Sequence, residues 1–267
     1  MTYLYETHLH TAGVSSCAKS RGPEYIKKYI DNGYSGIIVT DHFFHGNSAI
    51  PRDLPWSEWV KRFHGGYEET KEAGDRLGLD VFFGWEETFN EGDDYLVYGL
   101  DKEWLLQRPE MKHWSRGEQY RAVKESGGCV IQAHPFRQRY YINKVVLSAG
   151  CMDGVEAANG GHEDFAWDAL AYKYAEKIGK AITAGSDIHD ASDTNLLGVR
   201  LNKKLNNIND YVNIILNNEI AGLKADESRF ELHGAAAVTL PIEVRDKNDT
   251  VINRMSAGLV FCNIHLI

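Results

Sequence analysis

The stretch Gly36-Ile37-Ile38-Val39-Thr40-Asp41-His42 joins two patterns that together indicate the fold. Its first five residues are a glycine, three aliphatic residues and a threonine. The carboxylate of Asp41 and the imidazole of His42 follow them directly. A short, continuously apolar run is typical of a strand buried on both faces, as in a parallel sheet that is covered by helices. We therefore expect Asp41 and His42 to stand at the carboxyl end of a buried parallel strand.

Further short apolar segments indicate more strands of this kind: Tyr3–Tyr5, Val81–Gly84, Tyr95–Tyr98, Cys129–Ala133, Gly154–Ala157 and Ala181–Ala184. Amphipathic segments between them predict helices: Glu24–Asn32, Ser57–Leu77, Arg116–Ser126 and Phe165–Ile178. Alternating strands and helices are typical of parallel βα units. A chain of 267 residues is a common length for one α/β barrel. We therefore predict a single TIM-like α/β barrel domain over residues 1–267.

The end of the chain has a different pattern. The segments Val238–Val244 and Gly258–Ile264 resemble strands, and the turn-rich stretch Arg245–Asp249 lies between them. This pattern predicts a small C-terminal β appendage, at about residues 229–267, on the barrel.

Composition excludes several classes of protein. The four cysteines, Cys17, Cys129, Cys151 and Cys262, form no CxxC pair, which argues against a zinc ribbon or a disulfide framework. The start of the chain does not resemble a signal peptide, and no apolar run approaches the roughly 20 residues of a membrane span. We expect a cytoplasmic protein without a membrane partner. The net charge of -9 argues against a general nucleic-acid binder, although bound cations would still permit a phosphorylated substrate.

Five of the predicted strands are followed at once by side chains that bind metals. These side chains are His8 and His10, Asp41 and His42, Glu86, His134, and Asp187 and His189. The carboxyl ends of the strands of a βα barrel converge on one face, so these side chains should meet there. Imidazole and carboxylate together suit Zn²⁺, Mn²⁺ or Fe²⁺. Each pair alone has an ordinary explanation, such as a turn or a helix cap, but five together indicate a metal-dependent hydrolase.

The ordered set resembles the motifs of the PHP (polymerase and histidinol phosphatase) superfamily. The resemblance covers roughly residues 3–200 and rests on His8-Leu9-His10, Gly36–His42, Gly84-Trp85-Glu86, Ala133–Phe136, Gly154–Asn159 and Ala184–His189. It implies a distorted seven-stranded βα barrel that holds two to three divalent metal ions. It also implies that His8, His10, Glu86 and Asp187 hold one metal, that Glu86 bridges to a second shared with His134, and that His42 and His189 hold a third. Asp41 would either ligate a metal or orient His42.

The sequence departs from the family pattern in two places. Members often carry a histidine or aspartate soon after the first motif, but the stretch Thr11–Cys17 contains neither. Either the third metal is weakly held or Cys17 supplies a thiolate, with Ser15 and Ser16 as ordinary loop residues. Where relatives often have a histidine before the strand Tyr95–Tyr98, this chain has Asp94, which we predict to be a ligand of the second metal. The alternative for Asp94 is a solvated loop carboxylate.

The resemblance implies a phosphoesterase that uses metal-activated water on a small phosphorylated substrate: a nucleotide, a sugar phosphate or histidinol phosphate. Arg137 would assist at the phosphoryl group, and Asp187 or His189 would handle protons or ligate metal. Further residues have two open interpretations: they contact the substrate, or they are ordinary surface or core residues. These residues are Arg139, Lys19, Arg21, His45, His162, Phe43, Phe44, Trp56, Trp85 and Phe136. Two alternatives remain open: C–N hydrolysis at the same site, as in amidohydrolases, and a non-catalytic metal-binding module.

Overall fold

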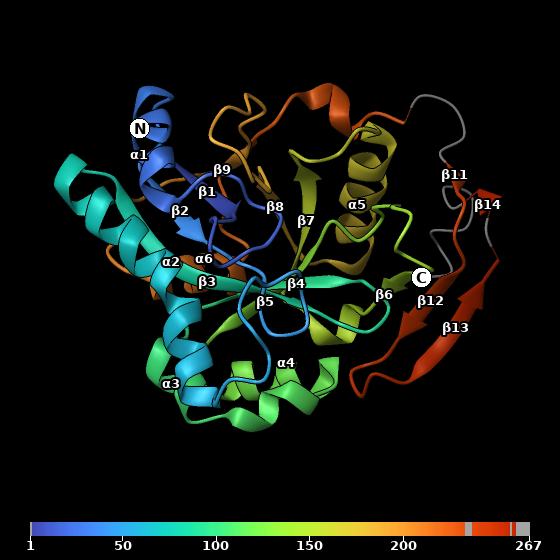
Figure 1. Cartoon of the computed structure of the whole chain (residues 1–267). Helices are drawn as coiled ribbons and strands as arrows, with labels where there is room; N and C mark the ends of the chain where they lie inside the picture. Colours follow the sequence, from blue (N-terminus) through green and yellow to red (C-terminus); the bar gives the residue numbers. More distant parts are fainter. Residues whose placement is uncertain (1, 233–236, 257, 260–267) are drawn as a thin grey trace.

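The structure is a computed structural model that describes residues 2–232, 237–256 and 258–259. Nine strands form one sheet in the order β10-β9-β1-β2-β3-β4-β5-β7-β8, which curves into a nearly closed barrel (Figure 1). Its strands are β1 (Tyr3–Leu9), β2 (Gly36–Val39), β3 (Asp80–Thr88), β4 (Asp94–Tyr98), β5 (Cys129–Ala133), β7 (Gly154–Asn159), β8 (Ala181–Gly185), β9 (Gly198–Leu201) and β10 (Gly222–Lys224). The barrel predicted from the sequence is confirmed, and β9 and β10 extend it beyond the seven predicted strands.

Strand β4 corrects the expectation that every strand of the barrel is parallel. It pairs antiparallel with both neighbours, and Asp94 at its start lies opposite Thr88 of β3 and Ala133 of β5. The connection from β3 to β4, residues 89–93, is a tight turn, whereas a parallel crossover needs about a dozen residues. The reversal places the beginning of β4 beside the carboxyl ends of β3 and β5.

The barrel has a seam where β1 faces β8. An isolated bridge joins Leu9 to Ile188 across this seam, and the backbone N–H of His10 donates to the carbonyl of Ile188 at 3.0 Å. The fully buried carboxylate of Glu6 adds a link, because it accepts a hydrogen bond from the backbone N–H of Ser186 at 2.9 Å. A side chain therefore replaces part of the regular hydrogen-bond ladder between the first and the last barrel strand.

The helices cover the outside of the barrel (Figure 1). The described residues form α1 (Gly22–Asp31), α2 (Trp56–Leu77), α3 (Lys102–Leu106), α4 (Arg116–Glu125), α5 (Phe165–Ile178) and α6 (Ile208–Leu216), and the short 3-10 helices η1 (Pro109–His113), η2 (Ala149–Cys151) and η3 (Glu227–Phe230). Four helices agree with the sequence prediction, whereas α3 and α6 were not predicted. Asn207 caps α6 by accepting from the N–H groups of Asn209 and Asp210, so a start signal for this helix was present in the sequence. No helix among the described residues is long and apolar enough to cross a membrane.

The C-terminal part forms a β appendage, as predicted, but with different bounds. A small sheet joins β6 (Val145–Leu147), β12 (Ile242–Arg245) and β13 (Val251–Met255), and β11 (Ala237–Val238) pairs with β14 (Gly258–Leu259). The predicted strand Val238–Val244 is interrupted before Ile242, where Pro241 stands. Residues 260–264 of the other predicted strand lie outside the described residues.

A buried arginine fastens the appendage to the barrel. Arg116 of α4 contacts Glu91 and Asp93 in the turn before β4 and Asp249 in the turn between β12 and β13. The guanidinium is 4% exposed, so three carboxylates surround one cation largely out of water. This network ties the appendage to the turn that leads into Asp94.

Candidate metal centre

Four buried donors converge at the mouth of the barrel, at the carboxyl end of β1 and beyond β8. The Nε2 atoms of His8 and His10 lie 3.1 Å apart. The His8 Nε2 atom lies 3.2 Å from Glu86 Oε1 and 3.4 Å from Asp187 Oδ1, and the His10 Nε2 atom lies 3.1 Å from the same Asp187 oxygen. Ligands held about 2.1 Å from a tetrahedral metal stand about 3.4 Å apart, so this spacing fits one metal ion.

A second group adjoins the first through Glu86. The Glu86 Oε1 atom lies 3.2 Å from the Nε2 atom of His134, which lies 3.7 Å from Asp94 Oδ2. Thr88 donates to the other oxygen of Asp94 at 2.6 Å and holds it toward the group. The ligand atoms of Glu86, Asp94 and His134 all lie within 4.8 Å of one another. The reversed strand β4 thus brings Asp94 to the place where the sequence predicted a ligand.

A third group consists of imidazoles. The ligand atoms of His10, His42 and His189 lie within 4.8 Å of one another, and the ring of His10 stacks at 4.3 Å on each of the other two. The His189 Nδ1 atom contacts the backbone carbonyl of Asp187 at 2.8 Å, which leaves its Nε2 available to a ligand. Cys17 lines the same cavity as His42 and His189, and although burial alone would raise the pKa of its thiol, the two imidazoles lower that pKa to about 6.

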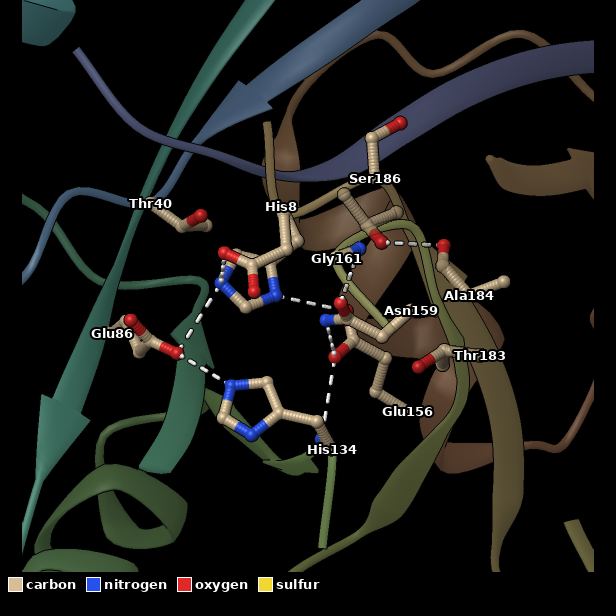
Figure 2. Close-up of polar contacts among 12 residues, drawn as sticks. His8, Thr40, Glu86, His134, Glu156, Asn159, Gly161, Thr183, Ala184 and Ser186 are labelled. Carbon is tan, nitrogen blue, oxygen red and sulfur yellow. Dashed lines mark hydrogen bonds and ion pairs between the residues drawn. The ribbon is translucent and has the colours of Figure 1, made fainter. Parts of the chain in front are cut away.

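Glu156, in the middle of β7, orients the first group, and the sequence analysis did not single it out. Figure 2 shows the imidazole of His8 between Glu86 and Glu156. The Glu156 Oε1 atom lies 2.9 Å from His8 Nδ1, while its Oε2 accepts from Asn159 Nδ2 at 2.8 Å and from the backbone N–H of His134 at 3.3 Å. A carboxylate behind a metal-binding imidazole fixes its tautomer and orientation. The sequence contained one sign of this role, because Glu156 is a charged residue within an otherwise apolar predicted strand.

Asp41 supports the site from behind. One of its oxygens accepts from the backbone N–H of Thr11 and from Ser15 Oγ, and the other accepts from Thr11 Oγ1, at 2.6 to 2.7 Å. Ser15 Oγ also contacts His10 Nδ1 at 3.2 Å. Asp41 belongs to none of the groups of closely spaced ligand atoms among the described residues. These contacts favour the orienting role for Asp41, and they show that Ser15 is more than an ordinary loop residue.

Backbone strain coincides with the candidate ligands. His134 has a φ of 30° and Asp187 a φ of 50°, and among the described residues other than glycine only Asn218 and Asp249 share this region. Such conformations cost on the order of 1–3 kcal/mol and persist where the surrounding structure and function require them. His134 follows β5 directly and Asp187 lies two residues beyond the end of β8, and the ligand atoms of both belong to the candidate metal groups.

The electrostatics of the site differ from group to group. Burial alone would lower the pKa of His8 and His42, but neighbouring carboxylates raise both well above the ordinary value, so a bound cation would replace those protons. Glu86 and His10, in contrast, are already held in the forms that bind metals. Burial raises the pKa of Glu86, but the imidazoles of His42 and His8 outweigh it and hold that pKa well below its ordinary value. Burial and the neighbouring imidazoles lower the pKa of His10 well below its ordinary value. Glu86 Oε2 and His42 Nδ1 lie 2.6 Å apart, yet neither has a hydrogen-bond partner of acceptable geometry. Ionised carboxylates and neutral imidazoles are the forms that bind metals.

A cavity of about 530 Å³ opens above these groups. His42, His189, Asp187, Asp94 and Cys17 line it on one side, and Arg137, Tyr140, Tyr141 and His45 contribute to its walls. Arg137 Nη2 donates to Asp187 Oδ2 at 2.5 Å and to Asn159 Oδ1 at 2.7 Å, while its Nε has no hydrogen-bond partner. Arg137 therefore lies beside the candidate ligand Asp187 and lines the cavity, and its role at a phosphoryl group stays a prediction.

Of the other candidate substrate residues, His45 lines the cavity, and most of the rest pair with surface carboxylates or pack in the interior. Arg139 pairs with Glu163, Lys19 with Asp190, and Arg21 with Glu69. Phe43, Phe44, Trp85 and Phe136 are buried, and Trp56 stacks on Trp59, so the structure favours the packing interpretation of these aromatic residues. His45 lines the cavity, whereas His162 is buried against Asp168. His233 and His265 lie outside the described residues.

No protein-family model and no curated protein matches the sequence. Among solved structures, the fold is similar to a two-domain protein from Bacteroides vulgatus that contains a predicted PHP-like metal-dependent phosphoesterase, with a TM-score of 0.59 and 16% identity. This match covers 82% of the chain and 64% of that protein, so the chain spans less than two thirds of its length.

Two further structures have the same general fold. A candidate metal-dependent phosphoesterase from Bifidobacterium adolescentis matches with a TM-score of 0.51 and 16% identity over 84% of this chain and 97% of that one. The lesion-specific endonuclease PfuEndoQ from Pyrococcus furiosus matches with a TM-score of 0.54 and 12% identity over 81% of this chain and 56% of that one. The chain thus has the α/β barrel fold of PHP-like proteins, as its motifs predicted.

Proposed function

We propose that the protein is a metal-dependent phosphoesterase that hydrolyses a small phosphate ester at a centre of two or three divalent ions. The observation that carries this proposal is the convergence of His8, His10, Glu86, His134 and Asp187 from the ends of four separate strands, next to one cavity. Two of the similar structures bear the name of metal-dependent phosphoesterase, which supports the reaction class.

The residues would divide among the ions by their spacing. His8, His10 and Asp187 would hold one ion, with Glu86 shared between it and a second ion held by His134 and Asp94. His42 and His189 would hold a third. Zn²⁺, Mn²⁺ and Fe²⁺ all suit such nitrogen and oxygen donors. Bound divalent ions supply the positive charge that activates water and stabilises a phosphoryl group.

The remaining roles fall to side chains at the cavity. Arg137 is held by Asp187 and Asn159 and lines the cavity, so its guanidinium would donate to a phosphoryl oxygen. His189 is partly exposed to the cavity, with its Nδ1 fixed by a carbonyl, so its Nε2 would bind a metal or a proton. A cavity of about 530 Å³ has the size of a small-molecule site.

The substrate class is part of this proposal. The net charge of -9 favours a nucleotide, a sugar phosphate or histidinol phosphate over a nucleic acid. The similarity to a lesion-specific endonuclease favours damaged DNA as the second candidate. A cytoplasmic location also belongs to the proposal, and three described cysteines with free thiols agree with it.

The test measures bound metal and phosphate release together. Purified protein is loaded with Mn²⁺, Zn²⁺ or Fe²⁺ and offered phosphate monoesters, one diester and a duplex with an abasic site. We expect release from a monoester that His8→Ala abolishes and that His113→Ala, at an exposed histidine outside the site, leaves intact. Cleavage of the duplex alone would select the DNA substrate. Bound metal with no release would favour C–N hydrolysis or a binding module, and absence of metal would refute the proposal.

A further inference from the structure

Cys17 stands apart from the other described cysteines because it faces the cavity. Cys129 and Cys151 are buried, and the Cys151 thiol donates to the backbone carbonyl of Asp246. Cys17 is partly exposed and lines the cavity together with His42 and His189. It is therefore the described thiol that can reach the candidate metal groups.

Backbone contacts fix Cys17 relative to both histidines. The N–H of Ser16 donates to the carbonyl of Asn47 at 2.7 Å, in the loop that follows His42. The N–H of Lys19 donates to the carbonyl of His189 itself at 2.7 Å. The loop is thus anchored on each side of Cys17, to the two segments that carry the imidazoles, so the position of the thiol does not depend on a free loop.

The donors that meet here form an incomplete coordination set. The ligand atoms within 4.8 Å of one another are those of His10, His42 and His189, and Cys17 lines the same cavity as His42 and His189. A carbonyl contact holds the Nδ1 atom of His189 and leaves its Nε2 available to this group, whereas the Nε2 atom of His10 lies 3.1 Å from Asp187 Oδ1 in the first group. A thiolate beside imidazoles is a typical donor set for Zn²⁺, and thiolates select soft ions over Mg²⁺ or Mn²⁺.

We propose that Cys17 is a metal ligand that, together with His42 and His189, forms a site for a thiophilic divalent ion such as Zn²⁺, Co²⁺ or Cd²⁺. The inference rests on the proposed function for the presence of metals, and it adds a soft subsite with its own ion preference. On binding, the sulfur–metal bond forms, the S–H bond breaks, and the proton leaves to solvent.

The test uses Co²⁺ because a cobalt–thiolate bond has a charge-transfer absorption in the near ultraviolet that imidazole and carboxylate ligands lack. The full chain is titrated with Co²⁺, and metal per chain is measured after removal of free ion. We expect the absorption in the wild type and in Cys151→Ala, and its loss in Cys17→Ser and Cys17→Ala, with one ion fewer per chain. Zn²⁺ should also slow alkylation of Cys17 in the wild type, and circular dichroism checks that the variants fold.

The outcomes separate this inference from the proposed function. Bound Co²⁺ without the absorption, or the absorption unchanged in Cys17→Ser, overturns the role of Cys17. Phosphate release by such a protein would leave the phosphoesterase in place. The absorption in a protein that releases phosphate from no ester would support the Cys17 site and refute the proposed function. Failure to bind Co²⁺ at all would overturn both.

Discussion

Replacement of Glu156 by glutamine should weaken metal binding without unfolding the protein. Its carboxylate receives three contacts: His8 Nδ1 at 2.9 Å, Asn159 Nδ2 at 2.8 Å and the backbone N–H of His134 at 3.3 Å. Glutamine has the same size, but its side-chain amide has one oxygen and one NH₂ group. The NH₂ group would therefore face at least one of these three N–H donors, and that hydrogen bond would be lost. Loss of such a supporting carboxylate typically lowers metal affinity about 10- to 100-fold, equivalent to about 1.4–2.7 kcal/mol.

The assay is competition for Zn²⁺ against a chelator of known affinity, with circular dichroism as a check on folding. Glu87→Gln is the matched control, because Glu87 is also buried and adjoins Glu86, but belongs to none of the described groups of ligand atoms. Burial and the charge of Asp94 raise the pKa of Glu87 well above its ordinary value, so an amide there replaces a neutral acid. Equal affinities for Glu156→Gln and the wild type, or equal losses in both variants, would refute the orienting role.

Three further predictions concern packing, charge and pH. Gly185→Ala should abolish metal binding, measured as metal per chain, because a Cβ there would lie 2.4 Å from the Cβ of His8. Arg116→Met should lower the free energy of unfolding in urea by about 3–5 kcal/mol, because it leaves the largely buried carboxylate of Asp93 without its cation, whereas Arg245 still pairs with Glu91 and Asp249. A loss below about 1 kcal/mol would contradict this. Burial and the charge of Glu86 raise the pKa of Asp94 to about 7 from 3.8, so its contribution to stability is present below pH 3.8 and is lost as the pH rises toward 7. In metal-free protein, the melting temperature of Asp94→Asn should therefore exceed that of the wild type by roughly 2 °C or more at pH 8, and it should not exceed it at pH 4. Equal melting temperatures at pH 8 would argue against the raised pKa.

Much of the barrel could be predicted because its strands are short, apolar and bounded. The stretch that contains Asp41 and His42 shows how a buried strand and its polar end can be recognised together. The direction of β4 could not be predicted from its own residues, since an apolar strand has the same composition in either direction. The short connection at residues 89–93 was the clue, because it is too short for a crossover.

The candidate ligands could be predicted more completely than the residues that support them. A ligand such as His134 stands at a strand end, where the topology of a barrel explains its position. Glu156 and Ser15 act through hydrogen bonds to other side chains, and those contacts exist only once distant segments have packed together. Glu156 is 148 positions from His8, so no local spacing relates the two residues.

The candidate ligands would also have a structural role, because they stand on both sides of the seam between β1 and β8. His8 and His10 stand on one side of it and Asp187 on the other, so an ion held by these three residues would cross-link β1 to the segment that follows β8. Such an ion would close a loop of nearly the whole barrel, as a disulfide would. In hydrogen exchange, the amides of His10 and Ile188, which bond across the seam, should lose protection first when a chelator is added, before those of β2 and β3.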